Sequence, residues 1–147
     1  MKHLLSRKNV CPIVVTRGND PTEMTSRFDG KKDGDIIRNF GVLLEQVAKC
    51  TPDGIVVFAT SYKYLELLIV KWEAMQITKR ILRHKLIFLE SKDKFETVEA
   101  LNGYKKACDC GRGGIFIAVT RGIVSETNMF DRHYARSVIL MGFPQIY

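Results

Sequence analysis

The amino-acid sequence predicts one α/β domain in which a mainly parallel β-sheet is flanked by helices. Short apolar runs alternate along the chain with stretches whose apolar residues recur every three or four positions. Such alternation is typical of a parallel sheet wound by right-handed crossovers. The run Ile115–Val119 has five apolar residues without polar alternation, as expected of a strand covered on both faces. The 147 residues suffice for one domain, and no stretch has the composition of a linker.

The first half of the chain predicts a strand, a polar loop, a helix, a second strand and a second helix. The strands are expected at Pro12–Val15 and Ile55–Ala59, with the loop running to Lys32. The first helix should begin at Asp35 and end at the Pro-Asp-Gly turn of Thr51–Gly54, because its apolar residues fall on one stripe. The second helix should follow Thr60, Ser61 and Tyr62, with Leu65, Leu68, Ile69, Trp72 and Met75 facing inward.

The second half predicts two further strands around a third helix, then a last strand. Strands are expected at Leu86–Leu89, from Ile115 onward and at Val138–Met141, and the helix at Phe95–Cys108. The turn Gly111–Gly114 leaves this helix and enters a strand, which is the reverse of the order in a phosphate-binding loop. We therefore expect a helix-terminating turn there, with Arg112 free to contact a phosphate or a carboxylate.

Polar residues gather directly after the Ile115–Val119 run, where ligands bind in open α/β sheets. Thr120, Arg121, Ser125 and Glu126 lie beside Gly122, and this set could hold phosphates or form a loop that senses them. The alternative is an ordinary solvated loop. The segment Ile13–Gly18 repeats the pattern with Arg17, so we expect both arginines at one sheet edge, converging on an anion.

The composition and the sequence motifs limit the kinds of function that this chain can have. The net charge of +7 favours a polyanionic partner, and no apolar run is long enough to predict membrane insertion. The four cysteines lack zinc-like spacing, so we expect no metal site and a reducing compartment. Cys11, Cys50 and Cys108 should pack as small hydrophobes. No Walker sequence and no catalytic triad pattern is present, and the acids Glu90, Asp93, Glu96 and Glu99 suit a helix start.

The chain contains an ordered set of short motifs: Cys11-Pro12, Arg17–Asp20, Ile37–Gly41, Pro52–Val56, Thr60–Tyr62 and Gly111–Gly113. This set resembles the second helicase domain of the XPD family, the iron-sulfur superfamily two DNA helicases of transcription factor TFIIH, and the resemblance extends from about Leu5 to Tyr147. It implies a three-layer RecA-like fold for residues 1–147. It also implies a parent ATP-dependent DNA helicase of 5′ to 3′ polarity that acts in transcription initiation and nucleotide excision repair.

The resemblance implies roles for particular residues. Phe58–Tyr62 matches motif IV, so Thr60, Ser61 and Tyr62 would lie along single-stranded DNA, although Tyr62 could instead only pack the helix start. Arg121–Phe130 matches motif V, in which Arg121 would touch the strand while Gly122, Ser125 and Glu126 line the nucleotide cleft. Arg112 and Arg136 would keep the cleft or domain surface in shape.

The resemblance also implies what other parts of the parent would supply. Its first motor domain, with the phosphate loop, the magnesium site and the iron-sulfur cysteines, would lie upstream, and motif VI beyond Tyr147. ATP and Mg²⁺ would therefore serve the full enzyme, the cluster would not bind to this chain, and this chain alone should be inactive. Expected partners are single-stranded DNA, the first helicase domain and TFIIH subunits, in the nucleus.

Motif V departs from the family pattern at three positions. Ile123, Thr127 and Met129 stand where the family has lysine, glycine and aspartate. Loss of that carboxylate removes an acceptor that could orient a water or a cation, and threonine adopts positive φ less readily than glycine. The alternative reading is therefore a non-catalytic, divergent module for protein or nucleic-acid interaction.

Overall fold

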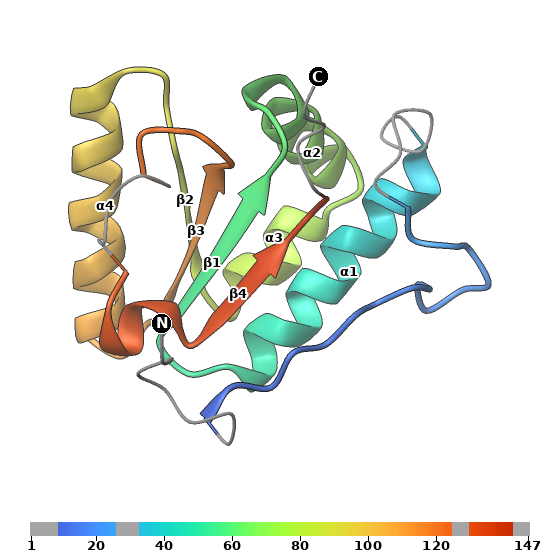
Figure 1. Ribbon diagram of the computed structural model, residues 1–147, viewed down its shortest axis with the longest axis horizontal. Coiled ribbons are helices and arrows are strands. Elements are labelled where there is room, and N and C mark those ends of the chain that lie inside the picture. The colour runs from blue at the N-terminus through green and yellow to red at the C-terminus, as the bar shows by residue number, and fades with distance from the viewer. Residues whose placement is uncertain (1–8, 26–32, 125–129, 143–147) are drawn as a thin grey trace, which may run out of the picture.

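The computed structural model describes residues 9–25, 33–124 and 130–142, and a parallel β-sheet forms its centre (Figure 1). The strands are β1 (Gly54–Ala59), β2 (Leu86–Leu89), β3 (Gly114–Val119) and β4 (Ser137–Leu140), and they lie in the order β2-β3-β1-β4. All three strand pairings are parallel. Every residue of β3 is buried, which confirms the prediction from its uninterrupted apolar run.

The register of the strands brings their carboxyl ends to one edge of the sheet. Gly54 pairs with Gly114 at the start of β1 and β3, and Ala59 pairs with Val119 at their ends. In β2, Leu89 pairs with Ile117. The segments that follow these three strands therefore emerge beside one another.

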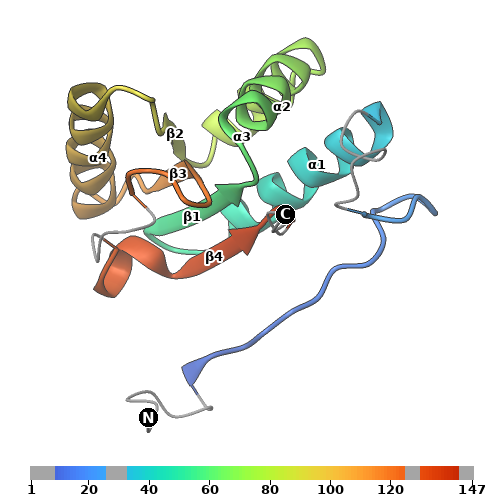
Figure 2. The ribbon, with the colours of Figure 1, turned by 45° about the horizontal axis from the view of Figure 1, so that its top comes forward.

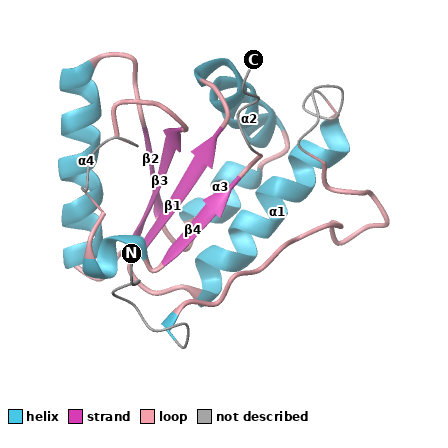
Figure 3. Cartoon of the chain, in the orientation of Figure 1, coloured by secondary structure: helices cyan, strands magenta, loops and turns pink. Residues whose placement is uncertain are grey.

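Helices cover both faces of the sheet (Figures 1 and 2). One face carries α1 (Gly34–Cys50), α2 (Tyr62–Ala74) and α3 (Ile77–Leu82), whose buried residues share a core with Ile55, Val57, Ile115 and Ile117. The other face carries α4 (Lys94–Asp109) and the 3-10 helix η3 (Arg132–Ala135), and its core contains Leu101, Tyr104, Phe116 and Val124. This confirms the predicted α/β fold with a parallel sheet between helical layers (Figure 3).

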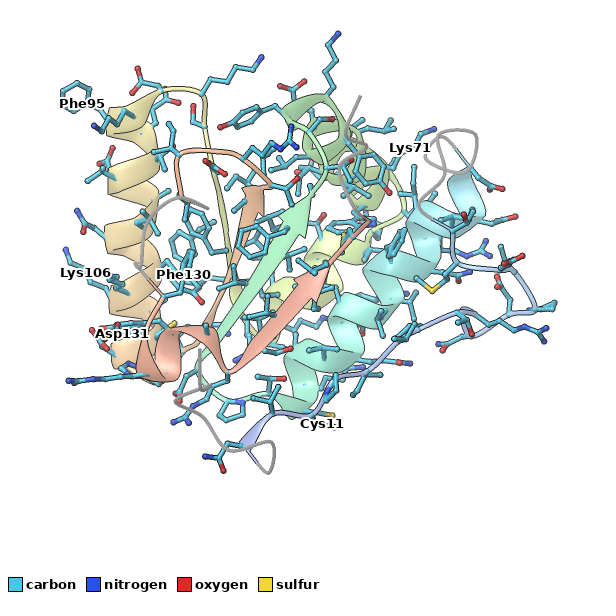
Figure 4. The ribbon with its side chains drawn as sticks, in the orientation of Figure 1. Cys11, Lys71, Phe95, Lys106, Phe130 and Asp131 are labelled. Carbon is cyan, nitrogen blue, oxygen red and sulfur yellow. The ribbon has the colours of Figure 1, made fainter. Side chains whose placement is uncertain are left out.

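Side chains on α4 divide between the core and the exterior. Phe95 and Lys106 point outward from this helix, whereas Phe130 lies on the inner side, between α4 and the sheet (Figure 4). The Phe130 ring contacts those of Tyr104 and Phe116, with centroid distances of 5.8 and 5.6 Å. The segment that leads into η3 is therefore packed between α4 and the sheet through Phe130.

Local sequence signals explain where the helices begin and end. Asp33, Ser61 and Asp93 are the N-caps of α1, α2 and α4, and each side chain accepts a backbone N–H of the first turn. After α4, Gly111 and Gly113 have φ angles of +78° and +72°. These values favour glycine and confirm the predicted helix-terminating turn.

The prediction of a strand at Pro12–Val15 is wrong. This segment is extended but pairs with no strand, and the side chains of Ile13 and Val14 are exposed. Arg17 forms only an isolated antiparallel bridge with Glu23. The expected convergence of Arg17 and Arg121 at one sheet edge fails for the same reason, because Arg17 does not follow a strand of the sheet.

The N-terminal segment is instead attached to α1 by polar contacts. Asp20 accepts hydrogen bonds from Arg38 at 2.7 Å and from Asn39 at 2.8 Å. A side chain on Gly18 would meet the Asn39 amide, since a Cβ there would lie 2.3 Å from Nδ2. Two of the motifs that carried the family resemblance, around Asp20 and Asn39, are therefore in contact.

Two smaller expectations also differ from the structure. The short helix α3 was not predicted. All four cysteines are free thiols, but only Cys108 is buried. The prediction that Cys11 and Cys50 pack as small hydrophobes is therefore wrong, since both are exposed at the borders of their elements.

Candidate nucleic-acid interface

Polar segments after β1, β2 and β3 form one continuous edge, which we call the carboxyl rim: Thr60–Tyr62, Glu90 and Thr120–Val124. Thr120 ties two of these segments together, because its backbone N–H and its hydroxyl both donate to the carbonyl of Ala59, at 2.9 and 3.2 Å. Ser61 and Arg121 are exposed on this rim. Ser61 and Tyr62 thus follow β1, and Arg121 follows its paired neighbour β3, so all three lie on this rim.

The motif IV residues occupy the start of α2. Ser61 caps the helix, since its Oγ accepts the N–H of Tyr64 at 3.2 Å, and its own hydroxyl hydrogen is left to donate elsewhere. The half-buried Tyr62 donates its hydroxyl to Glu90 at 3.3 Å. Burial and the charge of Glu90 raise the pKa of Tyr62, while the backbone of Ile123 lowers it. Tyr62 therefore remains a hydrogen-bond donor at neutral pH.

Glu90 is the central group of the carboxyl rim. Its side chain is 3% exposed, and it accepts the N–H of Val119 at 2.6 Å and the N–H of Val124 at 3.1 Å. The sequence grouped Glu90 with Asp93 as acids that favour a helix start. That explanation fits Asp93, which caps α4, and fails for Glu90. The signal available in the sequence was a lone acid directly after an apolar strand.

Gly122 allows the loop after β3 to close over Glu90. Arg121 has a φ of +68°, and the N–H of Gly122 donates to the carbonyl of Val119 at 2.8 Å, which makes a tight turn. A Cβ on Gly122 would lie 2.3 Å from Glu90 Oε1. Gly122 is buried here, so it acts through the shape of the loop and offers no side chain to a nucleotide.

Other predicted site residues lie away from the carboxyl rim or outside the described residues. Ser125 and Glu126 fall in the range that the structure does not describe. Arg112 donates to the carbonyls of Leu82 and His84. Arg136 forms a 3.5 Å ion pair with Asp53. Both arginines are at the amino ends of strands, the edge opposite to the carboxyl rim.

The described part of the chain has neither a candidate metal site nor a candidate membrane-spanning helix. Within residues 9–25, 33–124 and 130–142, no group of three or more His, Cys, Asp or Glu side chains could hold a metal ion. No helix there has the length and apolar character needed to cross a bilayer. The chemistry that these residues offer is hydrogen bonding and charge at the carboxyl rim.

The fold defines a class: a RecA-like α/β domain whose polar loops follow adjacent parallel strands. Comparison with protein-family models gives the family, since residues 44–146 match the helicase C-terminal domain. The chain belongs to the helicase C-terminal domain family.

Similar proteins confirm the resemblance to the XPD helicases. The chain is 43% identical over 143 residues to the general transcription and DNA repair factor IIH helicase subunit XPD of Arabidopsis thaliana, covering 97% of this chain and 19% of that protein. It is 46% identical to the subunit of the same name in Dictyostelium discoideum, covering 97% and 18%. The Schizosaccharomyces pombe ATP-dependent DNA helicase chl1 is 30% identical, covering 97% and 17%. The chain thus spans less than a fifth of the length of these relatives.

Proposed function

We propose that this chain is the C-terminal motor domain of an XPD-like ATP-dependent DNA helicase of 5′ to 3′ polarity, and that its carboxyl rim grips single-stranded DNA. The observation that supports this most is the adjacency of Ser61, Tyr62 and Arg121, which come from two paired strands. Loops at the carboxyl ends of parallel strands are where such folds bind ligands.

The chemistry of the carboxyl rim suits a strand of any base sequence. Arg121 and the Ser61 hydroxyl can donate to phosphate oxygens, which carry no sequence information. The ring of Tyr62 can stack a base, an interaction that contributes about 1–3 kcal/mol per base. Lys92, whose Nζ lies 5.8 Å from the centre of this ring, adds positive charge beside it. Such an interface holds the backbone and tolerates every base as the strand advances.

The remaining roles belong to the full enzyme. ATP with Mg²⁺ would be bound between this domain and the first helicase domain, with Gly122, Ser125 and Glu126 on this side of the cleft. Positioning and charge stabilisation account for most of the catalysis in such phosphoryl transfers. The iron-sulfur cluster would sit elsewhere in the parent. The names of the relatives support TFIIH subunits as partners and roles in transcription and DNA repair. Nuclear localisation and roles in transcription initiation and nucleotide excision repair are further parts of this proposal.

A second candidate function is a non-catalytic module that keeps the fold and binds nucleic acid or protein. Ile123 favours it, because this half-buried side chain replaces a family lysine on the loop after β3. Measuring DNA-stimulated ATP hydrolysis by the full-length protein separates the two functions. A motor should hydrolyse ATP faster when single-stranded DNA is added. A module should show no hydrolysis, and Ile123→Lys should not restore it.

A binding assay tests whether the carboxyl rim binds single-stranded DNA. It follows a labelled oligothymidylate by fluorescence anisotropy at several salt concentrations. Affinity should fall with salt, with a log-log slope of about −0.7 per phosphate contacted. Arg121→Gln should reduce the slope by about one such contact. Arg112→Gln is the matched control, since it removes the same charge from the opposite edge, and it should leave the slope unchanged. A flat salt response of the wild-type chain would refute the proposal.

A further inference from the structure

We propose that Glu90 is a positioning residue for the DNA grip: its buried carboxylate fixes the loop that carries Arg121 relative to the ring of Tyr62. This inference rests on the proposed function, because it assigns the alignment of the two DNA contacts to one side chain. The three segments that meet at Glu90 are the end of β3, the loop after β3 and the start of α2.

The hydrogen bonds of Glu90 offset the cost of burying its carboxylate. A buried carboxylate is costly unless it is paired or hydrogen-bonded. None of the salt bridges among the described residues includes Glu90. Among the described residues its hydrogen-bond donors are two backbone N–H groups and one phenol, and each of the three compensates part of the desolvation. A neutral amide at this position could not accept all of these bonds.

The two backbone bonds pin both ends of the loop after β3. Val119 precedes the loop and Val124 closes it, and both N–H groups point at the same carboxylate. Arg121 lies between them, exposed and with positive φ. The loop lies so close to the Glu90 carboxylate that a side chain at Gly122 would have no room. The path of the backbone at Arg121 therefore follows the position of Glu90.

The third bond reaches Tyr62, whose hydroxyl donates to Oε1, the same oxygen that accepts the N–H of Val124. At 3.3 Å it is the longest of the three, and Tyr62 is half-buried whereas Val119 and Val124 are buried. The backbone of Ile123 also forms a hydrogen bond with Tyr62, so the phenol is held both by Glu90 and by the loop that carries Arg121. A groove lies beside the ring and is lined by Tyr62, Leu65, Glu66, Leu89, Glu90, Ser91, Lys92 and Glu96. Glu90 thus joins the backbone that carries Arg121 to the ring of Tyr62.

Glu90→Gln tests this assignment, with Glu96→Gln as the charge-matched control. Glu96 lies on the same β2–α4 segment but is exposed, and its carboxylate accepts the hydroxyl of Ser91. Removing an acidic charge near DNA should by itself leave affinity equal or higher, and we expect that for Glu96→Gln. Glu90→Gln should instead weaken oligothymidylate binding about tenfold, because Arg121 and Tyr62 lose their alignment. Equal affinity of the two folded variants would overturn the proposal.

A double-mutant cycle separates positioning from a general loss of structure. Tyr62→Phe keeps the ring and removes the hydroxyl, and it should weaken binding about threefold. The double variant should bind no more weakly than Glu90→Gln alone, since the same linkage is broken in both. Fully additive losses would overturn the proposal. If Glu90→Gln does not fold, Tyr62→Phe with unchanged affinity has the same consequence.

Amide hydrogen exchange followed by NMR provides a readout that needs no DNA. In Glu90→Gln the Val124 amide should exchange at least tenfold faster than in the wild-type chain, while the amides in the middle of α1 exchange unchanged. Slow exchange at Val124 in this variant would overturn the positioning role. Absence of oligothymidylate binding by the wild-type chain would instead refute the proposed function, so the two failures are distinguishable.

Discussion

The two edges of the sheet use charge in opposite ways. At the amino ends of the strands, positively charged side chains make intramolecular contacts. Lys85 is 4% exposed and donates to the carbonyl of Asp53 at 2.9 Å, and Arg136 forms an ion pair with the Asp53 carboxylate. At the carboxyl rim the buried group is an anion, Glu90, and the cation Arg121 is exposed. None of the salt bridges among the described residues includes Arg121, so the carboxyl rim presents a positive charge without an acidic partner there.

This difference shows why net charge is a poor guide to a binding site. Burial lowers the pKa of Lys85, and the guanidinium of Arg112 donates to the carbonyls of Leu82 and His84 at the C-terminal end of α3. These cations contribute to the net charge of +7, yet their donors are directed at backbone oxygens. We infer that the amino edge contributes mainly to stability and the carboxyl rim mainly to binding, and the following variants test that division.

Tyr104→Ala should have the largest effect, and on stability alone. Tyr104 is fully buried at the amino edge, where its hydroxyl donates to the carbonyl of Tyr134 and its ring packs against Phe88 and Phe116. Truncating a large buried aromatic side chain costs about 3–5 kcal/mol. Urea unfolding should show this loss. If the fraction that stays folded bound oligothymidylate more weakly, the division between the edges would fail.

A matched pair of glycine substitutions compares the two edges directly. A Cβ on Gly54 would lie 2.4 Å from the carbonyl oxygen of Tyr134, and one on Gly122 would lie 2.3 Å from Glu90. Each change to alanine should lower the free energy of unfolding by about 1–3 kcal/mol, as overpacking does. Only Gly122→Ala should also weaken DNA binding, measured by anisotropy below the unfolding transition. Equal binding losses in the two variants would contradict the comparison.

Arg112→Gln should have a smaller effect on stability. The exposed guanidinium loses its hydrogen bonds to Leu82 and His84, each worth about 0.5–1.5 kcal/mol at most in such a setting. We expect a loss of about 1 kcal/mol in urea unfolding, with α3 as the first element to exchange its amides. Unchanged stability would show that water forms equally favourable hydrogen bonds with these two carbonyls.

Acidification should act on a third place, the attachment of the N-terminal segment to α1. Hydrogen bonds from Asn39, Thr22 and Arg38 lower the pKa of Asp20 to about 2, below the ordinary value of about 3.9. The stabilisation is therefore complete above about pH 4 and is lost as the pH falls toward 2. An NMR titration of the Asp20 carboxyl should show the lowered midpoint, and Asn39→Ala should raise it. An ordinary midpoint in the wild-type chain would exclude this attachment.

The parts of the fold that could be predicted are those set by local pattern. The uninterrupted apolar run of β3 and the apolar stripes of α1 and α4 each specify one element. The run Pro12–Val15 has the same local character, but strand formation depends on a partner, which no local pattern reveals. The six residues of α3 contain only two buried positions, Ile77 and Ile81, which is too short a repeat to detect.

The sequence pointed to Ser61, Tyr62 and Arg121 as candidate site residues and missed Glu90. Ser61, Tyr62 and Arg121 follow apolar strands, so the parallel sheet alone brings them to one edge. The role of Glu90 depends on donors that lie 28 to 34 residues away in the chain, and two of them are backbone N–H groups with no sequence signature. Such a contact follows from tertiary structure and has no periodic signal.

The long separations between Glu90 and its donors have a consequence for folding. The carboxylate finds its partners only after β2 has paired with β3 and α2 has docked, because contacts between distant segments require the intervening loops to close first. Helices of the domain can form before that stage, but the loop that displays Arg121 cannot adopt its shape. If the proposed function holds, a newly made or partly unfolded chain therefore lacks the surface proposed to bind DNA, and that surface arises only with the finished domain.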